Sequence, residues 1–554
     1  MEILDIQNLS FKYTSDAENA LSNVSFTVKD GAFVVLCGQS GCGKTTLLRL
    51  LKKELAPKGE MPGKITFKDN SPLIGFVMQN PEEQIVTDKV WHEMAFGLEN
   101  LGVPHESMRR RIGETANFFG INEWFHKNTD ELSGGQKQLL NLASVMVMQP
   151  KILLLDEPTS HLDPIAASEF IAALRKINSE LGTTVILAEH RLEEIFPIAD
   201  SVVLMEKGRA LLYDTPREVC RQLVSVNTPA FAPFLHALPS SVRIYSQLNI
   251  DDDCPLTVKE GREFLSRHFS RCDTQTCTVD GNCKPAEQAR DGETVRLKDV
   301  WFRYGKEQPD VLRGLTLSAH KGEILTILGG NGCGKTTALS VMSGQNRAYK
   351  GKILINGKKI EKYSGNELYR HNLALLPQNP QTVFLSDSVE HDYTETAKSL
   401  GYSQEEAERS IGEITTLLGI SHILKNHPYD LSGGEQQKAA LGKVLLLKPK
   451  ILLLDEPTKG IDAYSKHMLA DIIKNLKNDG LTIIIVTHDV EFAAETSDKC
   501  AMFFDGGIIS TDIPKEFFSD NNFYTTAASR ISRHLFDKAV LCEDVVSNAQ
   551  AFSS

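Results

Sequence analysis

The hydrophobic residues of the chain gather into short runs that are apolar at nearly every position. A strand buried on both faces of a sheet needs such a run, whereas a strand with one exposed face alternates apolar and polar residues. Continuous runs lie at 33–37, 152–155, 184–187, 324–328 and 482–486, and alternating segments at 26–28 and 315–317. Helical patterns occupy 45–55 and 336–343 and surround two LSGG turns. This order of strands and helices predicts an α/β fold with a largely parallel sheet.

The whole pattern occurs twice. A glycine-rich loop at 38–46 returns at 329–337, and its lysines are 291 residues apart (335 − 44). Self-similarity over most of a chain indicates a duplicated domain. We therefore predict a first domain at 1–222, a linker at 223–293, a second domain at 294–520 and a tail at 521–554.

The predicted linker contains prolines, an acidic run at 251–253 and four cysteines. Residues 257–269 have the pattern of a short helix, and 270–292 that of a mobile segment. The cysteines leave two alternatives, a flexible linker or a metal site; they are Cys254, Cys272, Cys277 and Cys283. Structural zinc sites usually contain a tightly spaced pair, and only one spacing here comes close, so the flexible linker is favoured.

Composition narrows the class of protein. The 554 residues are 41% hydrophobic and 24% charged, which is typical of a globular protein. The net charge of −12 argues against a general nucleic-acid binder, which needs a basic surface. The sequence shows neither an apolar run of the roughly 18–20 residues that span a bilayer nor the basic start of a signal peptide. The ten cysteines are scattered, which suits a reducing cytosol.

Both glycine loops match G-x-x-x-x-G-K-T, the sequence of a phosphate-binding loop. Glycines let successive backbone N–H groups point at phosphate oxygens, and the following helix N-terminus adds positive potential. Lys44 and Lys335 would reach the β- and γ-phosphates of a nucleotide, and Thr45 and Thr336 would each place a hydroxyl on Mg²⁺. A plain glycine turn is the alternative for a single match, but two matches in register, each after an apolar strand, argue against it.

Two acidic pairs end the 152–155 strand and its counterpart in the second copy. Asp156 and Asp455 suit a direct or water-mediated contact with Mg²⁺, and Glu157 and Glu456 are placed to polarise an attacking water. Charged strand ends are common, but the same Pro and Thr follow both pairs. The repeat therefore favours a catalytic role.

A histidine and a tyrosine recur as well. His190 and His488 each follow a buried strand, where a side chain can hydrogen-bond a γ-phosphate. Tyr13 and Tyr304 come early in each copy, and their rings can stack on adenine. The alternative for the tyrosines is packing within their own strands.

Together these motifs resemble those of the ATP-binding-cassette family. Each copy carries the family's aromatic A-loop, Walker A, Q-loop glutamine, LSGG signature, Walker B with glutamate, D-loop and switch histidine. The resemblance implies two tandem phosphate-loop ATPase domains, each with a RecA-like core, a mostly parallel sheet and a helical signature subdomain. It implies ATP and Mg²⁺ as cofactors and ATP hydrolysis as the reaction.

In that family two cassettes close head to tail on two ATP molecules, and here both cassettes lie in one chain. The first site would combine Tyr13, Gly38, Gly41, Gly43, Lys44, Thr45, Thr46, Gln79, Asp156, Glu157 and His190 with Ser432, Gly433 and Gly434. The second would combine Tyr304, Gly329, Gly332, Gly334, Lys335, Thr336, Thr337, Gln378, Asp455, Glu456 and His488 with Ser133, Gly134 and Gly135. The resemblance also places Gln79 and Gln378 at Mg²⁺ and the D-loop residues Asp163 and Asp462 at the nucleotide.

Within the family, residues 79–102 and 188–194 resemble the fused ATPase of energy-coupling-factor importers, which take up vitamins, their precursors or transition-metal ions. The resemblance implies two kinds of membrane partner, a T-like subunit and a substrate-binding subunit, and a peripheral position on the cytoplasmic face of the membrane. The copies depart from the family pattern at Lys459, where a small residue is usual, and in ending the signature with Gln136 and Glu435. These differences leave open whether the two sites turn over equally.

Two other functions of cassette ATPases have sequence requirements that this chain does not meet. A soluble twin-cassette factor that acts on ribosomes is expected to carry a basic, strongly helical linker, whereas this linker is slightly acidic. A DNA-repair or chromosome ATPase needs a long heptad insertion between Walker A and Walker B, for which neither copy has room.

The segment that follows Gln79 is the predicted docking face for the membrane partner. Within 80–100 we expect Asp88 to cap a short helix and Trp91 and Met94 to lie on its surface. The alternative is that these apolar side chains pack into the helical region of the cassette itself.

Overall fold

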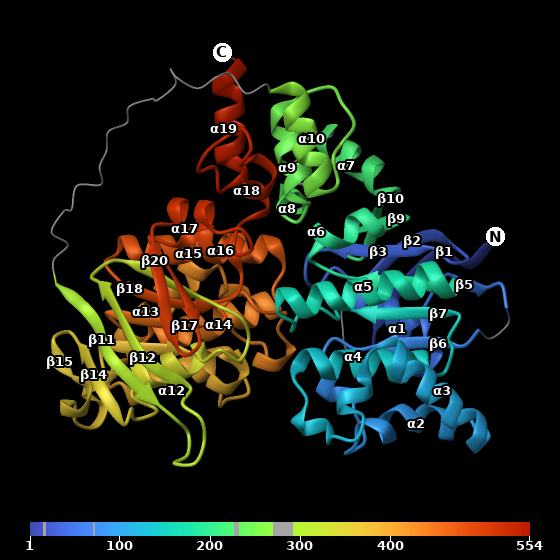
Figure 1. The fold of residues 1–554 in the computed structure, drawn as a ribbon. Coiled ribbons are helices and arrows are strands. Elements are labelled where there is room, and N and C mark those ends of the chain that lie inside the picture. Colours follow the sequence, from blue (N-terminus) through green and yellow to red (C-terminus); the bar gives the residue numbers. More distant parts are fainter. Residues whose placement is uncertain (15–17, 70–71, 226–231, 270–291, 554) are drawn as a thin grey trace. The chain divides into compact units, whose positions relative to one another are not determined.

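The structure is a computed structural model that describes residues 1–14, 18–69, 72–225, 232–269 and 292–553 (Figure 1). The chain forms two compact units, Met1–Thr257 with Asp462–Tyr464, and Val258–Ile461 with Ser465–Ser554. The predicted mobile segment, as far as residue 291, lies outside the described residues together with Cys272, Cys277 and Cys283.

Two sheets form the framework of the first unit. The larger has the order β10-β9-β3-β8-β7-β6 and is parallel except for the edge pair β10–β9. In the smaller, β2, β4 and β5 each pair with β1 in antiparallel fashion. The strands are β1 (Glu2–Tyr13), β2 (Leu21–Lys29), β3 (Phe33–Gly38), β4 (Gly59–Glu60), β5 (Lys64–Phe67), β6 (Ile74–Val77), β7 (Ile152–Asp156), β8 (Thr184–Ala188), β9 (Ser201–Glu206) and β10 (Arg209–Asp214).

The helices of the first unit either cover the larger sheet or form a separate helical region around α2–α4. They are α1 (Lys44–Leu51), α2 (Val90–Asn100), α3 (His105–Phe118), α4 (Gly134–Met146), α5 (Pro164–Leu181), α6 (Leu192–Ile195), α7 (Pro216–Ser225), α8 (Ala232–Leu235) and α9 (Ser240–Leu248). The helix predicted at 45–55 ends at Leu51, because the backbone of Lys52 is extended and a 3-10 turn follows.

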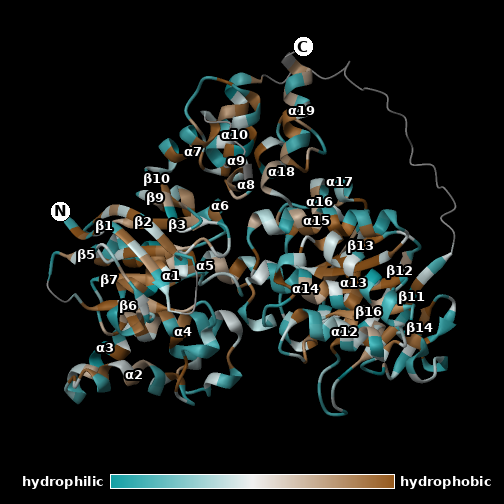
Figure 2. Ribbon diagram, turned by 180° about the vertical axis from the view of Figure 1, so that it is seen from behind, coloured by the Kyte–Doolittle hydropathy of each residue, from teal (hydrophilic) through white to brown (hydrophobic). Residues whose placement is uncertain are grey.

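Strand β3 shows why its sequence is apolar throughout. Phe33 and Val35 belong to the same hydrophobic cluster as Phe170 of α5, whereas Val34 belongs to the opposite cluster with Leu47 of α1. Both faces of the strand are therefore covered, and Figure 2 shows the central strands of each unit as largely hydrophobic. The loop that follows β3 is thereby fixed at the carboxyl edge of the sheet, where open α/β sheets bind ligands.

The second unit repeats this architecture. Its larger sheet has the order β16-β17-β18-β13-β19-β20 and is parallel except for β19–β20, and its smaller antiparallel sheet has the order β12-β11-β14-β15. The strands are β11 (Glu293–Phe302), β12 (Leu312–His320), β13 (Ile324–Leu328), β14 (Lys350–Ile355), β15 (Lys358–Lys359), β16 (Leu373–Leu376), β17 (Ile451–Asp455), β18 (Thr482–Thr487), β19 (Lys499–Phe504) and β20 (Gly507–Asp512).

The helices of the second unit include the helix predicted at 257–269, which is α10, and two helices in the tail, α18 and α19. They are α10 (Val258–His268), α11 (Lys335–Met342), α12 (Val389–Ser399), α13 (Gln404–Leu418), α14 (Gly433–Leu445), α15 (Ala463–Asn478), α16 (Val490–Thr496), α17 (Pro514–Asp520), α18 (Ala527–Ser532) and α19 (Cys542–Ser553). Helix α10 packs against α18, and Oγ of Ser266 lies 2.7 Å from Nε2 of His534. Among the described helices, none is both long and apolar enough to cross a lipid bilayer.

Candidate nucleotide-binding sites

The glycine loop after β3 curls around the amino group of a buried lysine. Nζ of Lys44 donates hydrogen bonds to the carbonyl oxygens of Gly38 (3.0 Å) and Gln39 (3.1 Å). In the second unit, Nζ of Lys335 donates to the carbonyls of Gly329 and Gly330 at 2.9 and 3.0 Å. Both predicted phosphate-binding loops therefore place the cation inside the curve of their own backbone.

The glycines are required by the backbone of this loop. Gly41 and Gly43 have φ of 78° and 101°, and Gly332 and Gly334 have φ of 74° and 112°, which side chains rarely adopt. A Cβ on Gly43 would also approach the carbonyl oxygen of Ala20 to 2.8 Å. A residue with a side chain at these positions would therefore strain the loop.

A threonine and an aspartate meet beside each loop. Oγ1 of Thr45 donates to Oδ1 of Asp156 at 3.0 Å, and Oγ1 of Thr336 donates to Oδ1 of Asp455 at 3.1 Å. Burial raises the pKa of each aspartate to about 6, and the adjacent glutamate acts in the same direction. The structure thus brings together the predicted hydroxyl and carboxylate ligands in both units.

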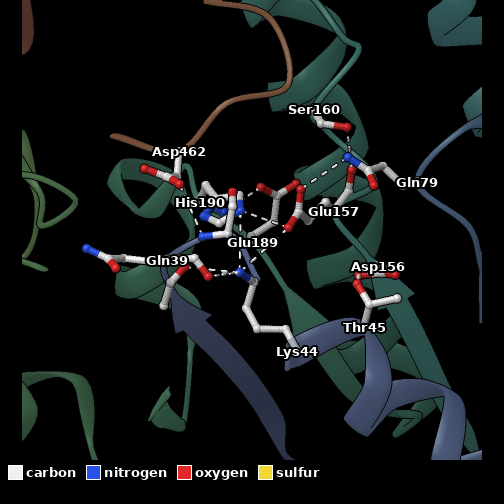
Figure 3. Close-up of polar contacts among 12 residues, drawn as sticks. Gln39, Lys44, Thr45, Gln79, Asp156, Glu157, Ser160, Glu189, His190 and Asp462 are labelled. Carbon is white, nitrogen blue, oxygen red and sulfur yellow. Dashed lines mark hydrogen bonds and ion pairs between the residues drawn. The ribbon is translucent and has the colours of Figure 1, made fainter. Parts of the chain in front are cut away.

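Glu157 lies at the centre of the first site (Figure 3). Oε1 of Glu157 is 2.8 Å from Nε2 of His190 and 3.7 Å from Nζ of Lys44, and Oε2 accepts a hydrogen bond from Nε2 of Gln79 at 3.2 Å. The backbone of Glu157 has a φ of 44°, a strained conformation for a residue with a side chain. The predicted switch histidine, lysine and Q-loop glutamine therefore converge on the carboxylate of the predicted base.

Glu456 has the corresponding position in the second unit, with a φ of 48°. It lies 2.9 Å from Nδ1 of His488 and 3.7 Å from Nζ of Lys335. The hydroxyl of Thr487 donates to Oε2 of Glu456 at 3.2 Å, and Gln378 is exposed. The second site thus has the same groups as the first but a different pattern of contacts.

Both glutamates are ionised more readily than an ordinary buried glutamate. Burial alone would raise the pKa of Glu157, but His190 and Lys44 more than offset it, and the pKa is lowered below its usual value. The same holds for Glu456, whose pKa is lowered by His488 and Lys335 against the effect of burial. Each carboxylate can therefore accept a proton at neutral pH.

The recurring tyrosines contact the helix of the glycine loop. Oη of Tyr13 lies 2.9 Å from Oγ1 of Thr46, and Oη of Tyr304 lies 3.0 Å from Oγ1 of Thr337. The side chain of Tyr304 is 60% exposed, so its ring can meet a ligand. The structure thus places both predicted adenine platforms beside their loops.

Each LSGG signature begins a helix. Ser133 caps α4 and exchanges hydrogen bonds with Gln136. Ser432 is the N-cap of α14, and its N–H and hydroxyl donate to Oε2 of Glu435 at 3.0 and 2.6 Å. Glutamine and glutamate are the two residues that close a capping box, so the difference between the signatures preserves the local structure. A Cβ on Gly433 would approach the carbonyl of Gly460 to 2.6 Å, which explains a glycine there.

The D-loop aspartates differ in their contacts. Asp163 caps α5 by accepting a hydrogen bond from the N–H of Ala166 at 2.8 Å. Asp462 is grouped with the first unit, where Oδ2 accepts a hydrogen bond from the N–H of Ser40 at 3.1 Å (Figure 3).

The structure corrects two expectations for the segment after Gln79. Helix α2 has Lys89 at its N-cap and no side-chain cap, so the role predicted for Asp88 is wrong. Met94 is fully buried and is not part of the surface, whereas Trp91 is 40% exposed. The apolar stripe of α2 is thus divided between the helical core and the surface.

Two buried carboxylates were missed by the motif analysis. Oε2 of Glu93 accepts hydrogen bonds from the N–H groups of Val86 (3.1 Å) and Thr87 (2.8 Å), and so fixes the turn before α2. The other is Glu189, which precedes the switch histidine and is 2% exposed. Its only signal in the sequence is that the matching residue of the second copy is Thr487.

The fold and the paired sites define a chain with two phosphate-binding-loop ATPase domains. The chain belongs to the ABC transporter family, whose model matches residues 21–160 and 312–459. Members of this family bind and hydrolyse ATP, and this chain is an ATP hydrolase of that type.

Relatives match the chain over nearly its full length. A protein named as an ABC transporter ATP-binding protein from Bacillus thuringiensis subsp. konkukian (strain 97-27) is 42% identical over 98% of this chain and 97% of its own. A Bacillus subtilis (strain 168) protein, YkoD, is named provisionally for HMP/thiamine import and is 28% identical over 100% of this chain and 99% of its own. Among solved structures, cbiO1 from Clostridium perfringens, described as part of the ABC transporter complex cbiONQ, has a TM-score of 0.39 and 28% identity, and covers 41% of this chain and 91% of its own.

Proposed function

We propose that the chain is the ATP-hydrolysing subunit of an importer of the energy-coupling-factor type, which moves a vitamin, a vitamin precursor or a transition-metal ion through separate membrane subunits. The observation that carries this proposal is the likeness to the Bacillus subtilis protein named for HMP/thiamine import, because it extends over the whole of both chains.

In the proposed site, the glycine loop and its neighbours hold ATP. Lys44 contacts the β- and γ-phosphates while the loop N–H groups surround them, and the ring of Tyr13 stacks on adenine. Lys335 and Tyr304 do the same in the second unit. The open φ > 0 turns at Gly41 and Gly43 support this arrangement, since they leave room for phosphate beside the main chain.

Mg²⁺ fits the two threonine–aspartate pairs. Hydroxyl and carboxylate oxygens are the hard ligands that this ion prefers, and they lie together in both units. Thr45 and Asp156 would hold the ion in the first site, Thr336 and Asp455 in the second, and Gln79 and Gln378 would join them. Bound Mg²⁺ supplies charge neutralisation on the phosphates.

Hydrolysis then needs a base and a group that orients the γ-phosphate. Glu157 accepts the proton of the attacking water, since its lowered pKa keeps it ionised at neutral pH. His190 hydrogen-bonds the γ-phosphate, and Lys44 balances the negative charge there. Glu456, His488 and Lys335 have these roles in the second site.

We propose two composite sites, as the resemblance implies. The N-termini of α4 and α14 present backbone N–H groups and the positive end of a helix, which suit a phosphate. Ser432, Gly433 and Gly434 would complete the first site, and Ser133, Gly134 and Gly135 the second. ATP would hold the two cassettes together until hydrolysis releases them.

The segment after Gln79 is proposed to dock the membrane partner at the cytoplasmic face of the membrane. Val86 is 67% exposed and Phe96 37% exposed, and with Trp91 they leave more apolar surface than an exposed turn and helix need. Gln79 contacts the proposed base Glu157, so this segment is connected to the γ-phosphate position. Movement at the nucleotide can thus reach the docking face.

The test is reconstitution of the chain with its membrane subunits in liposomes that contain ATP inside. Uptake of thiamine, its pyrimidine precursor, Co²⁺ and Ni²⁺ would be measured with labelled solutes. We expect ATP-dependent uptake of one of these, and loss of that uptake in a chain carrying both Glu157→Gln and Glu456→Gln. Co-sedimentation with ribosomes, without co-purification of any membrane subunit, would instead support the twin-cassette translation factor.

A further inference from the structure

The residue before the switch histidine differs chemically between the two cassettes. It is Glu189 in the first and Thr487 in the second. Both side chains are buried. A buried carboxylate is tolerated only if donors surround it, so the presence of Glu189 requires a specific local network.

Two loops supply the donors to Glu189. Oε1 accepts hydrogen bonds from both the hydroxyl and the N–H of Thr159, the latter at 2.9 Å, in the loop after β7. Oε2 accepts from the N–H groups of His190 (2.9 Å) and Arg191 (3.5 Å), in the loop after β8. The carboxylate therefore joins the Walker B loop to the histidine loop through their main chains.

In the second cassette the proposed base itself has this connecting role. Oε2 of Glu456 accepts hydrogen bonds from the hydroxyl of Thr487 (3.2 Å) and from the N–H of His488 (3.4 Å), and lies 2.9 Å from Nδ1 of His488. Glu456 is thus hydrogen-bonded to the histidine loop through the Thr487 hydroxyl and the His488 N–H, and it lies beside the ring.

In the first cassette the same main-chain N–H is already bonded to Glu189. Glu157 consequently meets only the ring of His190, and it meets Nε2 rather than Nδ1 (Figure 3). We infer that Glu189 is a positioning residue of the first ATP site, which fixes the main chain of His190 in place of Glu157, so that Glu157 meets the histidine loop only at the ring. The inference rests on the roles assigned above to Glu157 and His190.

The difference has a kinetic consequence. In the inferred mechanism, a glutamate turns away from the histidine loop when it takes the proton of a water. Glu157 gives up one contact to that loop, whereas Glu456 gives up its contacts with the Thr487 hydroxyl, the His488 N–H and the His488 ring. The first site therefore performs the chemical step faster than the second.

The test uses the purified full-length chain with Glu456→Gln, which silences the second site. Glu189→Thr copies the second cassette, and Glu189→Gln keeps the size but turns an N–H₂ group toward donors. In single-turnover hydrolysis with excess protein we expect either variant to slow the step by about tenfold or more, because small displacements of a catalytic group have such effects. The KM for ATP is expected to stay unchanged, since the hydrogen bonds of the Glu189 carboxylate go to Thr159, His190 and Arg191.

A double-mutant cycle separates positioning from a general structural effect. The effect of Glu189→Gln is expected to vanish when His190→Ala is also present, and to persist in full beside His488→Ala. Equal effects in both cycles would overturn the inference, as would a change confined to KM or to the thermal midpoint. A Glu456→Gln chain without any hydrolysis would also overturn it, because the first site would then not turn over by itself. None of these outcomes depends on transport, so the importer proposal is tested separately.

Discussion

The hydroxyl of Tyr13 lies 2.9 Å from Oγ1 of Thr46, two residues after the lysine of the glycine loop. Tyr304 and Thr337 repeat this contact at 3.0 Å. The contact joins the strand that carries the aromatic ring to the helix that follows the phosphate loop. This contact therefore helps to set the distance from the base platform to the phosphate loop.

Two substitutions of Tyr13 distinguish the contribution of the ring from that of the hydroxyl contact. Tyr13→Ala removes the ring, and since stacking of a base on an aromatic ring contributes roughly 1–3 kcal/mol, ATP affinity at the first site is expected to fall about tenfold. Tyr13→Phe keeps the ring and loses only the hydroxyl contact, so its affinity is expected to stay close to that of the original chain. Titration with a fluorescent ATP analogue measures both, and equal losses in the two variants would contradict a stacking role.

Replacing the two proposed bases tests whether both sites hydrolyse ATP. Glu157→Gln and Glu456→Gln keep the side-chain shape but remove the proton acceptor, so each is expected to preserve ATP binding and to slow its own site by about 10²–10⁴-fold. The double variant is expected to retain ATP through gel filtration. If Glu456→Gln left the ATPase rate untouched while Glu157→Gln abolished it, the second site would be regulatory and this prediction wrong.

Asp156 predicts a pH-dependent stability difference in the absence of Mg²⁺ and nucleotide. Burial raises its pKa from 3.8 to about 6, so the folded chain holds the proton more tightly than the unfolded chain. The resulting stabilisation is complete below about pH 4 and is lost as the pH rises through about 6. An asparagine side chain cannot ionise, so the free energy of unfolding of Asp156→Asn should not fall with pH in this way. Relative to the original chain, the variant should gain about 3 kcal/mol of stability between pH 4 and pH 7, which corresponds to a pKa raised by about two pH units.

Urea unfolding at several pH values, with EDTA present, measures this difference. Asp455→Asn is the matched variant in the second unit, because the pKa of Asp455 is also raised to about 6. A stability difference that is constant from pH 4 to pH 7 would show that the carboxylate does not titrate as described.

Two residues of α2 provide a matched pair for the docking face. Trp91→Ala alters a surface side chain, so folding and ATP hydrolysis should survive while co-purification with the membrane subunits and uptake are lost. Met94→Ala opens a cavity in the helical core, which typically costs about 2–5 kcal/mol. Thermal unfolding and pull-down of the membrane subunit distinguish the two effects. A large loss of thermal stability in the Trp91 variant would place that side chain in the core as well.

The sequence was most informative where a motif has an obligatory geometry. The apolar run 33–37 predicted β3, and G-x-x-x-x-G-K-T predicted a glycine loop followed by a helix, which lies between β3 and α1. Few backbone structures other than a buried strand fit a continuous apolar run, and few other than a tight loop fit glycines at these fixed positions. The repeat predicted that Thr336 and Asp455 both serve one Mg²⁺ site in the second copy, because its motifs follow in the same order. The structure places the two side chains in contact.

The remaining features depend on contacts that no motif specifies. Glu189 forms its network through main-chain N–H groups of two loops. A glutamate that precedes a histidine in the sequence does not predict these hydrogen bonds. Met94 and Trp91 both have large side chains, and the packing of the helical region buries Met94 and leaves Trp91 partly exposed. The left-handed backbone of Glu157 likewise follows from the tertiary environment of the strand end rather than from residue type.

The packing of α10 against the tail has a practical consequence for dissecting the chain. Phe264 and Leu265 of α10 are buried, and so is Ile531 of α18, in the same compact unit. A recombinant fragment that starts at residue 294 would lack α10, and one that stops at residue 520 would lack α18. In either fragment the remaining helix of the pair would expose apolar side chains that are buried in the full chain. An expression plasmid for the second cassette should encode residues 258 to 554.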